Sequence, residues 1–201
     1  LKERILHLLE KTHFHSDGLF VMDASKRSGK GNAYFTGFGR HKRIVFFDTL
    51  IENLVPEEVE AILAHELGHF KKKHILKMMI KSFALSLISL WLLSYLMHSE
   101  FFHHMHGTIS NVSAVTLLLF SLVTSTYTYF FIPVNSYFSR KNEFEADQFA
   151  AEFSNSKALI SALLKLYKKN TSSLTTDPLY SAFYFSHPPA IERIEHLESL
   201  N

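Results

Sequence analysis

Two long stretches without a charged residue dominate the hydrophobic pattern of the chain. No Asp, Glu, Lys or Arg occurs at positions 82–99, and the second uncharged stretch covers 112–134. A helix needs roughly 20 mostly apolar residues to cross the hydrocarbon core of a bilayer. The alternative is a helix buried in a soluble core, which is disfavoured because the stretches are long and apolar on every face. We therefore predict two transmembrane helices that form a hairpin.

The charged residues that flank this hairpin predict its orientation. Five lysines at positions 71–81 precede the first stretch, and Arg140 with Lys141 follows the second. The connector at 100–111 has three His and no Lys or Arg, and we expect it to be a flexible loop. Because Lys and Arg accumulate on the cytoplasmic side of membrane proteins, we expect both basic ends on that side. A hairpin also returns the chain to the side that it left.

Outside these stretches, the spacing of apolar residues predicts helices and short strands. Amphipathic helices are expected at 1–12, at 157–169 and from Pro189 onward, and strands at 19–22, 33–36 and 43–47. We expect the three strands to form an antiparallel sheet. An exposed edge of such a sheet can hold an extended peptide by main-chain hydrogen bonds. A sheet that only covers the neighbouring helix fits the sequence equally well.

Composition limits the chemistry. The net charge of +2, without a continuous basic face, argues against a nucleic-acid partner. The chain has no Cys, so disulfides are excluded and any zinc must use His and carboxylate ligands. The first residue is Leu1, within a helical pattern, and we therefore expect a fragment of a longer protein.

The strongest chemical signal is the motif His65-Glu66-Leu67-Gly68-His69. On a helix, two histidines four residues apart share one face and can bind one zinc ion. Glu66 between them can take a proton from the water that zinc activates. Pro56 and the two glutamates after it favour the start of this helix. A chance match is the alternative in a chain with 13 His, and the helical context together with the downstream carboxylates favours a metal site.

Two carboxylates after the second stretch complete the expected site. A catalytic zinc with two His ligands needs a third protein ligand and an open position for water. Glu143 and Asp147 are four residues apart, hence on one face of a helix, at the foot of the returning hairpin. We predict Glu143 as the third ligand and Asp147 as the acceptor of a hydrogen bond from a ligating imidazole. Glu145 points elsewhere on the helix and is expected to be solvated.

These motifs, in this order and separated by two apolar stretches, resemble the metallopeptidases of family M48, and within them the type I CAAX prenyl proteases. The resemblance covers nearly the whole chain. Further matching segments are Ser25-Lys26-Arg27, Asn32-Ala33-Tyr34-Phe35, positions 42–50, Ser186-His187-Pro188-Pro189 and Glu192-Arg193. It implies a single M48 peptidase domain over 1–201, which lacks the N-terminal membrane helices of the family. The expected fold class is mainly α and integral to the membrane, with zincin-like catalytic helices, a small β-sheet and the two-helix hairpin.

The resemblance also implies roles for the candidate residues. One zinc ion is expected on His65, His69 and Glu143, with Glu66 as general base. Asn32 and Ala33 are expected on an edge strand that aligns the substrate backbone, and His187 is expected to stabilise the oxyanion. From the residues alone, a His before two prolines is held rigidly; it could be a packing residue, but the functional interpretation is favoured. Arg193 is expected to brace Asp147 or a carboxylate of the substrate.

The function expected from these features is that of a membrane-embedded zinc metalloendopeptidase. It would cleave near the C-terminus of prenylated, CAAX-type proteins or peptides, with the substrate and the lipid bilayer as its partners. One alternative is a quality-control protease of the HtpX type, which cuts damaged membrane proteins. Another is a catalytically silent membrane scaffold that keeps zinc for structure. The expected location is a multi-pass membrane protein with a cytoplasmic active site, in the inner membrane of a bacterium or the ER membrane of a eukaryote.

Overall fold

The computed structural model describes residues 1–26, 31–38, 41–107, 112–169 and 176–200. Arg27, at the end of one matching segment, lies outside the described residues. The elements are α1 (Lys2–Lys11), β1 (Gly18–Met22), β2 (Ala33–Phe38), β3 (His41–Phe47), α2 (Asp48–Asn53), α3 (Pro56–Lys71), α4 (His74–Met97), α5 (Glu100–Met105), α6 (Ser113–Tyr129), α7 (Ile132–Phe153), α8 (Ser156–Lys169), α9 (Pro178–Tyr184) and α10 (Ala190–Ser199).

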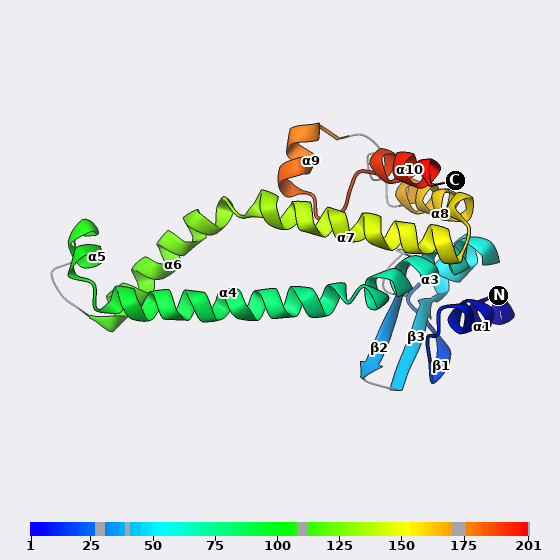
Figure 1. Cartoon of the computed structure of the whole chain (residues 1–201), viewed down its shortest axis with the longest axis horizontal. Helices are drawn as coiled ribbons and strands as arrows, with labels where there is room; N and C mark the ends of the chain where they lie inside the picture. Colours follow the sequence, from blue (N-terminus) through cyan, green and yellow to red (C-terminus); the bar gives the residue numbers. More distant parts are fainter. Residues whose placement is uncertain (27–30, 39–40, 108–111, 170–175, 201) are drawn as a thin grey trace.

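The chain divides into a long arm and a compact body (Figure 1). The arm consists of the described residues between 75 and 139, where α4 runs outward and α6 with the first part of α7 runs back. The body consists of the other described residues. In it, the sheet and α1 lie on one side of α3, and α7, α8 and α10 lie on the other (Figure 1). The fold is therefore mostly helical with one small sheet, as the hydrophobic pattern predicts.

The sheet has the strand order β1-β3-β2. β2 pairs with β3 antiparallel, as expected, but β1 pairs with β3 parallel, so the expectation of an antiparallel sheet is wrong for this pair. Register explains the difference, because the end of β1 and the start of β2 lie at the same end of the sheet. The connection between them reverses the chain, and β3 then inserts between the two strands. β2 is left as an edge strand.

The body has one continuous apolar core around α3. The central residues of α3 are buried on nearly all sides, and side chains of α1, β3, α2, α8 and α10 pack around them. The largest fully buried side chains of this core are Ile5, Leu8, Ile44, Leu50, Val59, Leu63, Leu67, Leu159 and Leu197. Burial of this kind stabilises a protein by roughly 1.5–3 kcal/mol for each large apolar side chain. The core therefore holds α3 in a fixed position.

A close approach of α3 and α7 depends on Gly68. A Cβ atom at this position would lie 2.9 Å from Cα and 3.1 Å from the carbonyl oxygen of Ala146 on α7. These distances are too short for a side chain against backbone atoms, so only glycine lets the two helices touch here. The contact brings the carboxylates of α7 within reach of the histidines on α3.

The arm exposes its apolar residues. Leu90 is 62% exposed and Trp91 is 69% exposed on α4, and most large apolar side chains of α6 are also open. This excludes the alternative of a helix buried within the described protein. By length and hydropathy, α4 can cross a membrane, and α6 with α7 forms a second candidate if the bent pair is taken as one span. The first stretch, expected at 82–99, belongs to a helix that already starts at His74.

The second stretch, expected as one helix at 112–134, is broken in the structure. α6 ends at Tyr129, α7 begins at Ile132, and the two axes are bent by 53°. Pro133 explains the break, because it has no N–H to donate to the carbonyl four residues earlier and its ring collides with that carbonyl. The stretch expected as one helix is therefore two helices in the structure, and its role as one membrane span stays a prediction.

The connector between the two stretches contains a short helix where we expected only a loop. This helix, α5, begins at Glu100 and is capped by Ser99, whose side chain accepts a hydrogen bond from the backbone N–H of Phe102. His103 is buried, with Nε2 3.3 Å from Oγ1 of Thr116 on α6. Residues 108–111 of the connector lie outside the described residues.

Candidate metal centre

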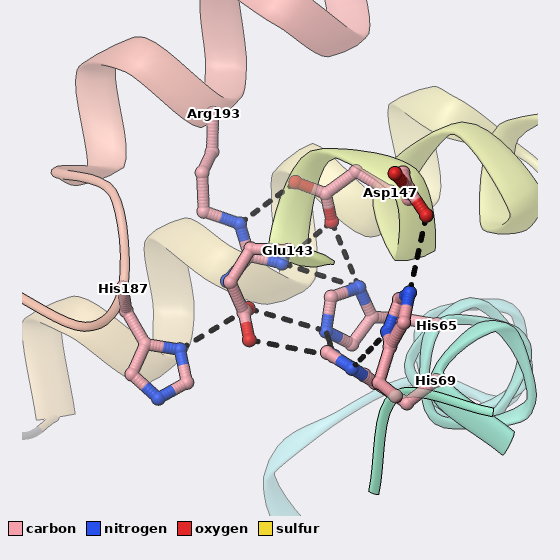
Figure 2. Close-up of polar contacts among 8 residues, drawn as sticks. His65, His69, Glu143, Asp147, His187 and Arg193 are labelled. Carbon is pink, nitrogen blue, oxygen red and sulfur yellow. Dashed lines mark hydrogen bonds and ion pairs between the residues drawn. The ribbon is translucent and has the colours of Figure 1, made fainter. Parts of the chain in front are cut away.

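Helix α3 places two histidines side by side. His65 and His69 are one helical turn apart, so both rings leave the helix on the same face. Their Nε2 atoms are 3.2 Å apart (Figure 2). Two imidazole lone pairs at this distance repel each other unless a proton or a metal ion lies between them. The pair can therefore share either a proton or a metal ion.

Glu143 brings a carboxylate from α7 to the same point. Its Oε2 lies 3.5 Å from Nε2 of His65, and its Oε1 lies 3.4 Å from Nε2 of His69 (Figure 2). In the described part of the chain, these three side chains form the one cluster able to hold a metal ion. Tetrahedral ligands at roughly 2.0–2.1 Å from zinc are about 3.3–3.4 Å from one another. These donors are of the kind that zinc binds, and the Nε2–Nε2 distance of 3.2 Å is close to this spacing.

The charge state of Glu143 suits a cation, whereas His65 must lose a proton before it can bind one. Burial acts to raise the pKa of Glu143, but hydrogen bonds from His187 and from the two histidines of α3 hold it well below its usual range. Burial acts to lower the pKa of His65, but hydrogen bonds to Asp147 and Glu143 raise it to about 9. A ligating imidazole must be neutral. The proton on His65 at neutral pH therefore competes with a metal ion for the site.

Asp147 and Arg193 hold the outer side of His65. Oδ1 of Asp147 lies 2.8 Å from Nδ1 of His65, so Nε2 of this ring is left to face the site. Arg193 on α10 donates from Nε to Oδ2 at 2.8 Å and from Nη2 to Oδ1 at 2.6 Å. Both side chains are buried. Of the two partners expected for Arg193, the structure places Asp147 against it (Figure 2).

His74, a histidine that no motif in the sequence marks, also contacts the site. Nδ1 of His74 lies 3.0 Å from Nδ1 of His69, and Nε2 of His74 lies 3.2 Å from Oε2 of Glu145. The side chain of Glu145 is 33% exposed, so it is partly solvated as expected, but its carboxylate also pairs with His74. Residues five apart on one helix lie on different faces. Here α3 ends at Lys71, and the left-handed conformation of Lys73 (φ 57°) turns the chain so that His74 faces His69.

A cavity of about 400 Å³ lies beside the histidines. Glu66 lines it and is half-buried, so that its carboxylate can meet both water and the metal site. Asn32 and Ala33 line the same cavity from the sheet, and Ala33 is the first residue of the edge strand β2. The expected general base and the expected substrate-aligning residues therefore share one cavity with the metal ligands.

His187 reaches the site from the segment after α9. Its Nδ1 lies 3.1 Å from Oε2 of Glu143, and its ring is largely exposed (Figure 2). The hydrogen bond to Glu143 raises the pKa of His187 against the opposing effect of burial. The second ring nitrogen has no partner among the residues drawn in Figure 2. The ring is therefore anchored through Nδ1, and in its protonated form it can donate from Nε2 as well.

Arg140 holds the segment that carries His187. Its Nη1 donates to three carbonyl oxygens at the end of α9, those of Ser181, Ala182 and Phe185, at 2.9–3.1 Å. The carbonyl of Ser181 also accepts a hydrogen bond from the backbone N–H of Phe185, so Arg140 ties the last turn of α9 to the residue that follows it. From the sequence, Arg140 served only to predict the orientation of the hairpin in the membrane. No motif marks it as a residue that holds another segment in place.

Comparisons with known proteins agree with this geometry. The family model described as peptidase family M48 matches residues 1–201. The CAAX prenyl protease 1 homolog of Dictyostelium discoideum is 39% identical over 98% of this chain and 47% of its own length. The CAAX prenyl protease 1 of Saccharomyces cerevisiae is 34% identical over 98% of this chain and 47% of its own length. The human homolog is 33% identical over 100% of this chain and 50% of its own length.

A solved structure is also similar. The crystal structure of S. mikatae Ste24p matches with a TM-score of 0.86 at 34% identity, over 98% of this chain and 49% of that chain. The chain therefore spans about half the length of the curated relatives and of the solved structure that it matches.

Proposed function

The chain belongs to peptidase family M48, and from this premise we propose that it is the catalytic part of a membrane-embedded zinc metalloendopeptidase. One observation carries the proposal. One possible ligand atom from each of His65, His69 and Glu143 lies within 4.8 Å of the others, in the wall of a cavity that Glu66 also lines. Glu66 is thus next to the ligands without belonging to the ligand cluster, as a general base must be.

The proposed mechanism assigns each step to a side chain. His65, His69 and Glu143 would hold one zinc ion, which supplies Lewis-acid activation of water and of the scissile carbonyl. Glu66 takes the proton from the attacking water and passes it to the leaving amine. Asp147 accepts the Nδ1–H of His65 and thereby fixes the tautomer that leaves Nε2 free for the metal.

Two further features would bind the substrate. The edge strand β2, starting from Asn32 and Ala33, offers main-chain groups to an extended peptide beside the site. Protonated His187 would donate a hydrogen bond to the oxyanion that forms on the substrate carbonyl, a charge that develops only in the transition state. Since His187 already contacts Glu143, its ring is held at the edge of the ligand cluster.

We propose prenylated, CAAX-type proteins or peptides as substrates, with cleavage near their C-terminus. The relatives are named CAAX prenyl proteases, which supports this class. The exposed apolar surface of the arm begins directly after His74, next to the metal site. A lipid-bearing peptide could keep its lipid against apolar surface while its backbone enters the cavity.

The proposed topology has the arm in the membrane, with 82–99 and 112–134 as its spans and the site on the cytoplasmic side. The apolar exposure of α4 and the lysines at its base support this arrangement. The chain has no Cys, so single cysteines at positions 73, 107 and 141 can be labelled without background. With an impermeant thiol reagent on intact cells, we expect labelling at 107 and protection at 73 and 141. Labelling of 73 and 141 from opposite sides would contradict the hairpin.

The activity is tested with three substrates. A peptide that ends in a farnesylated CAAX sequence should be cleaved, the same peptide without the lipid serves as the matched control, and an unfolded membrane protein tests the quality-control alternative. Glu66→Gln should abolish hydrolysis while zinc remains bound, because the amide cannot take the proton and contacts no metal. Normal turnover by this variant would contradict the general-base role. Cleavage of none of the substrates by a zinc-loaded protein would favour the scaffold.

Metal analysis separates the ligand from its supporting residue. Glu143→Ala removes a proposed ligand. It should weaken zinc binding by more than about 100-fold, which is the largest usual effect of removing a residue that only hydrogen-bonds to a ligand. Asp147→Ala should weaken it by about 10–100-fold, because the ligand remains but loses its orientation. Equal zinc affinity of Glu143→Ala and the wild type would show that the wrong carboxylate is assigned.

A further inference from the structure

The two histidines of α3 differ in what holds their outer nitrogens. Nδ1 of His65 lies directly on a carboxylate, Asp147, at 2.8 Å. Nδ1 of His69 lies on another imidazole, Nδ1 of His74, at 3.0 Å. A carboxylate follows only after this second ring, because Oε2 of Glu145 lies 3.2 Å from Nε2 of His74. Both carboxylates come from α7, as does Glu143.

We propose that His74 and Glu145 are positioning residues for the metal site, forming a two-residue relay that orients His69. The inference rests on the proposed zinc site and assigns a role to two residues that no motif marks. It does not place either residue on the metal or on the substrate.

The proton positions along the relay follow from the ligand chemistry. If Nε2 of His69 gives its lone pair to a metal ion, Nδ1 of the same ring carries the proton. That N–H points at Nδ1 of His74, which must therefore be the acceptor. His74 then carries its own proton on Nε2 and donates it to the carboxylate of Glu145. Each hydrogen is used once and every bond has one donor and one acceptor.

The backbone around His74 is built for this contact. His74 is 4% exposed although it is the first residue of the otherwise open helix α4. Lys73 before it adopts a left-handed conformation, which costs a residue other than glycine roughly 1–2 kcal/mol. Without this turn, His74 would continue α3 and face away from His69. The unfavourable conformation and the buried histidine thus occur together at the one turn that completes the relay.

A simple packing role for His74 makes different predictions from the relay. A packing residue can be replaced by an apolar side chain of similar size without loss at the metal site. A relay residue cannot, because the N–H of His69 then loses its acceptor and the ring can rotate or change tautomer. The two roles are therefore separated by metal affinity and ligand geometry, with folding stability measured alongside.

The test uses detergent-solubilised protein and Zn²⁺ alone, titrated against a competing chelator. His74→Leu should weaken zinc binding by about 10–100-fold, the usual effect of losing the outer partner of a ligating histidine. His74→Asn places an amide oxygen near the former Nδ1 and should restore most of the affinity. His98→Leu, at the far end of the same helix, is the matched control and should bind zinc like the wild type.

A Co²⁺-substituted sample gives a second readout. Its visible absorption depends on the arrangement of the ligands, so His74→Leu should shift the spectrum and His98→Leu should not. For the carboxylate, Glu145→Leu should weaken zinc binding less than His74→Leu, and Glu145→Gln should be milder because its carbonyl still accepts. Glu152→Gln, an exposed glutamate later on α7, is the matched control.

A double-mutant cycle tests whether the residues act in series. Glu145 acts through His74 in the relay, so Glu145→Leu should add no further loss in the His74→Leu background. Additive losses would contradict the relay, as would zinc binding by folded His74→Leu within twofold of the wild type. If His74→Leu does not fold, His74→Asn and Glu145→Leu still decide the question. A wild-type protein that binds no zinc would instead overturn the proposed function.

Discussion

The body and the arm use the same kinds of residue in opposite ways. The body buries its large apolar side chains around α3 and encloses charged groups only where they are paired, as with Arg193 and Asp147. The arm turns Leu, Ile, Phe and Trp side chains outward along α4 and α6. In water such a surface is a liability, whereas in lipid it is the expected exterior. The two regions therefore differ in which side chains they expose, and this difference supports the proposed placement of the arm in a membrane.

The metal site lies where the two regions meet. His65 and His69 belong to the best-buried helix of the body, and His74 is the first residue of the arm. Glu143 and Asp147 follow the arm on its return. The site therefore forms only if the arm brings α7 back against α3. Variants that change the body, the arm or their junction separately can test this difference between the buried body and the exposed arm.

The largest effect is expected from the charge pair inside the body. Arg193→Met leaves the carboxylate of Asp147 buried with one partner fewer, and removing one member of a buried pair costs about 3–5 kcal/mol. Arg4→Met is the control, because its ion pairs to Glu57 and Glu60 are at the surface and contribute at most about 1 kcal/mol. Chemical denaturation of both variants in detergent measures the difference. Similar losses in the free energy of unfolding for the two variants would show that water reaches the buried pair of Arg193 and Asp147.

The next largest effect compares one substitution in the two regions. Leu8→Ala removes a side chain that is 2% exposed in the body and should cost about 2–5 kcal/mol. Leu90→Ala removes one that is 62% exposed on the arm and should change the free energy of unfolding by about 0.5 kcal/mol or less. Both variants are measured by denaturation in the same detergent. Equal costs would mean that the arm packs against protein after all.

The sequence predicted the chemistry of the site better than the shape of the fold. His65, His69, Glu143 and Asp147 follow from helical spacing, and family membership is confirmed by the match over 1–201. The parallel pairing of β1 with β3 was missed because apolar alternation does not encode strand order. The break before α7 carried a signal that was not used, namely Pro133 inside an apolar stretch.

The relay of His74 and Glu145 could not be predicted. Its existence depends on the end of α3 at Lys71, and neither Lys72 nor Lys73 is a residue that breaks helices. From spacing alone, His74 belongs to a different face of the helix from His69. Glu145 was expected to be solvated for the same reason, because helical spacing does not show that His74 lies beside it.

A smaller effect is expected from pH. The folded pKa of His65, about 9, lies above its ordinary value of 6.5. Its proton therefore stabilises the metal-free protein below about pH 6.5, and this contribution is lost as pH rises through 9. Zinc needs the neutral ring, so its affinity should rise about tenfold per pH unit from pH 7 towards 9 and then level off. Chelator competition at several pH values measures this rise. A flat profile would mean that the metal-free site does not hold this proton.

The smallest effect concerns the junction itself, where one backbone conformation separates the body from the arm. Lys73 is left-handed (φ 57°), and glycine adopts this conformation without the steric cost of a Cβ atom. Part of that gain is offset by the greater freedom of glycine in the unfolded chain, so Lys73→Gly should raise the free energy of unfolding by about 0.5–1 kcal/mol.

Lys72 provides the matched control, because it has an ordinary helical conformation and glycine there should lower stability by up to about 1 kcal/mol. Opposite signs at two adjacent lysines would show that the turn, and not the loss of a positive charge, is responsible. Zinc affinity should stay at the wild-type level in Lys73→Gly, since His74 keeps its place against His69. A stabilised Lys73→Gly that binds zinc weakly would mean that the lysine itself supports the site, beyond shaping the turn between body and arm.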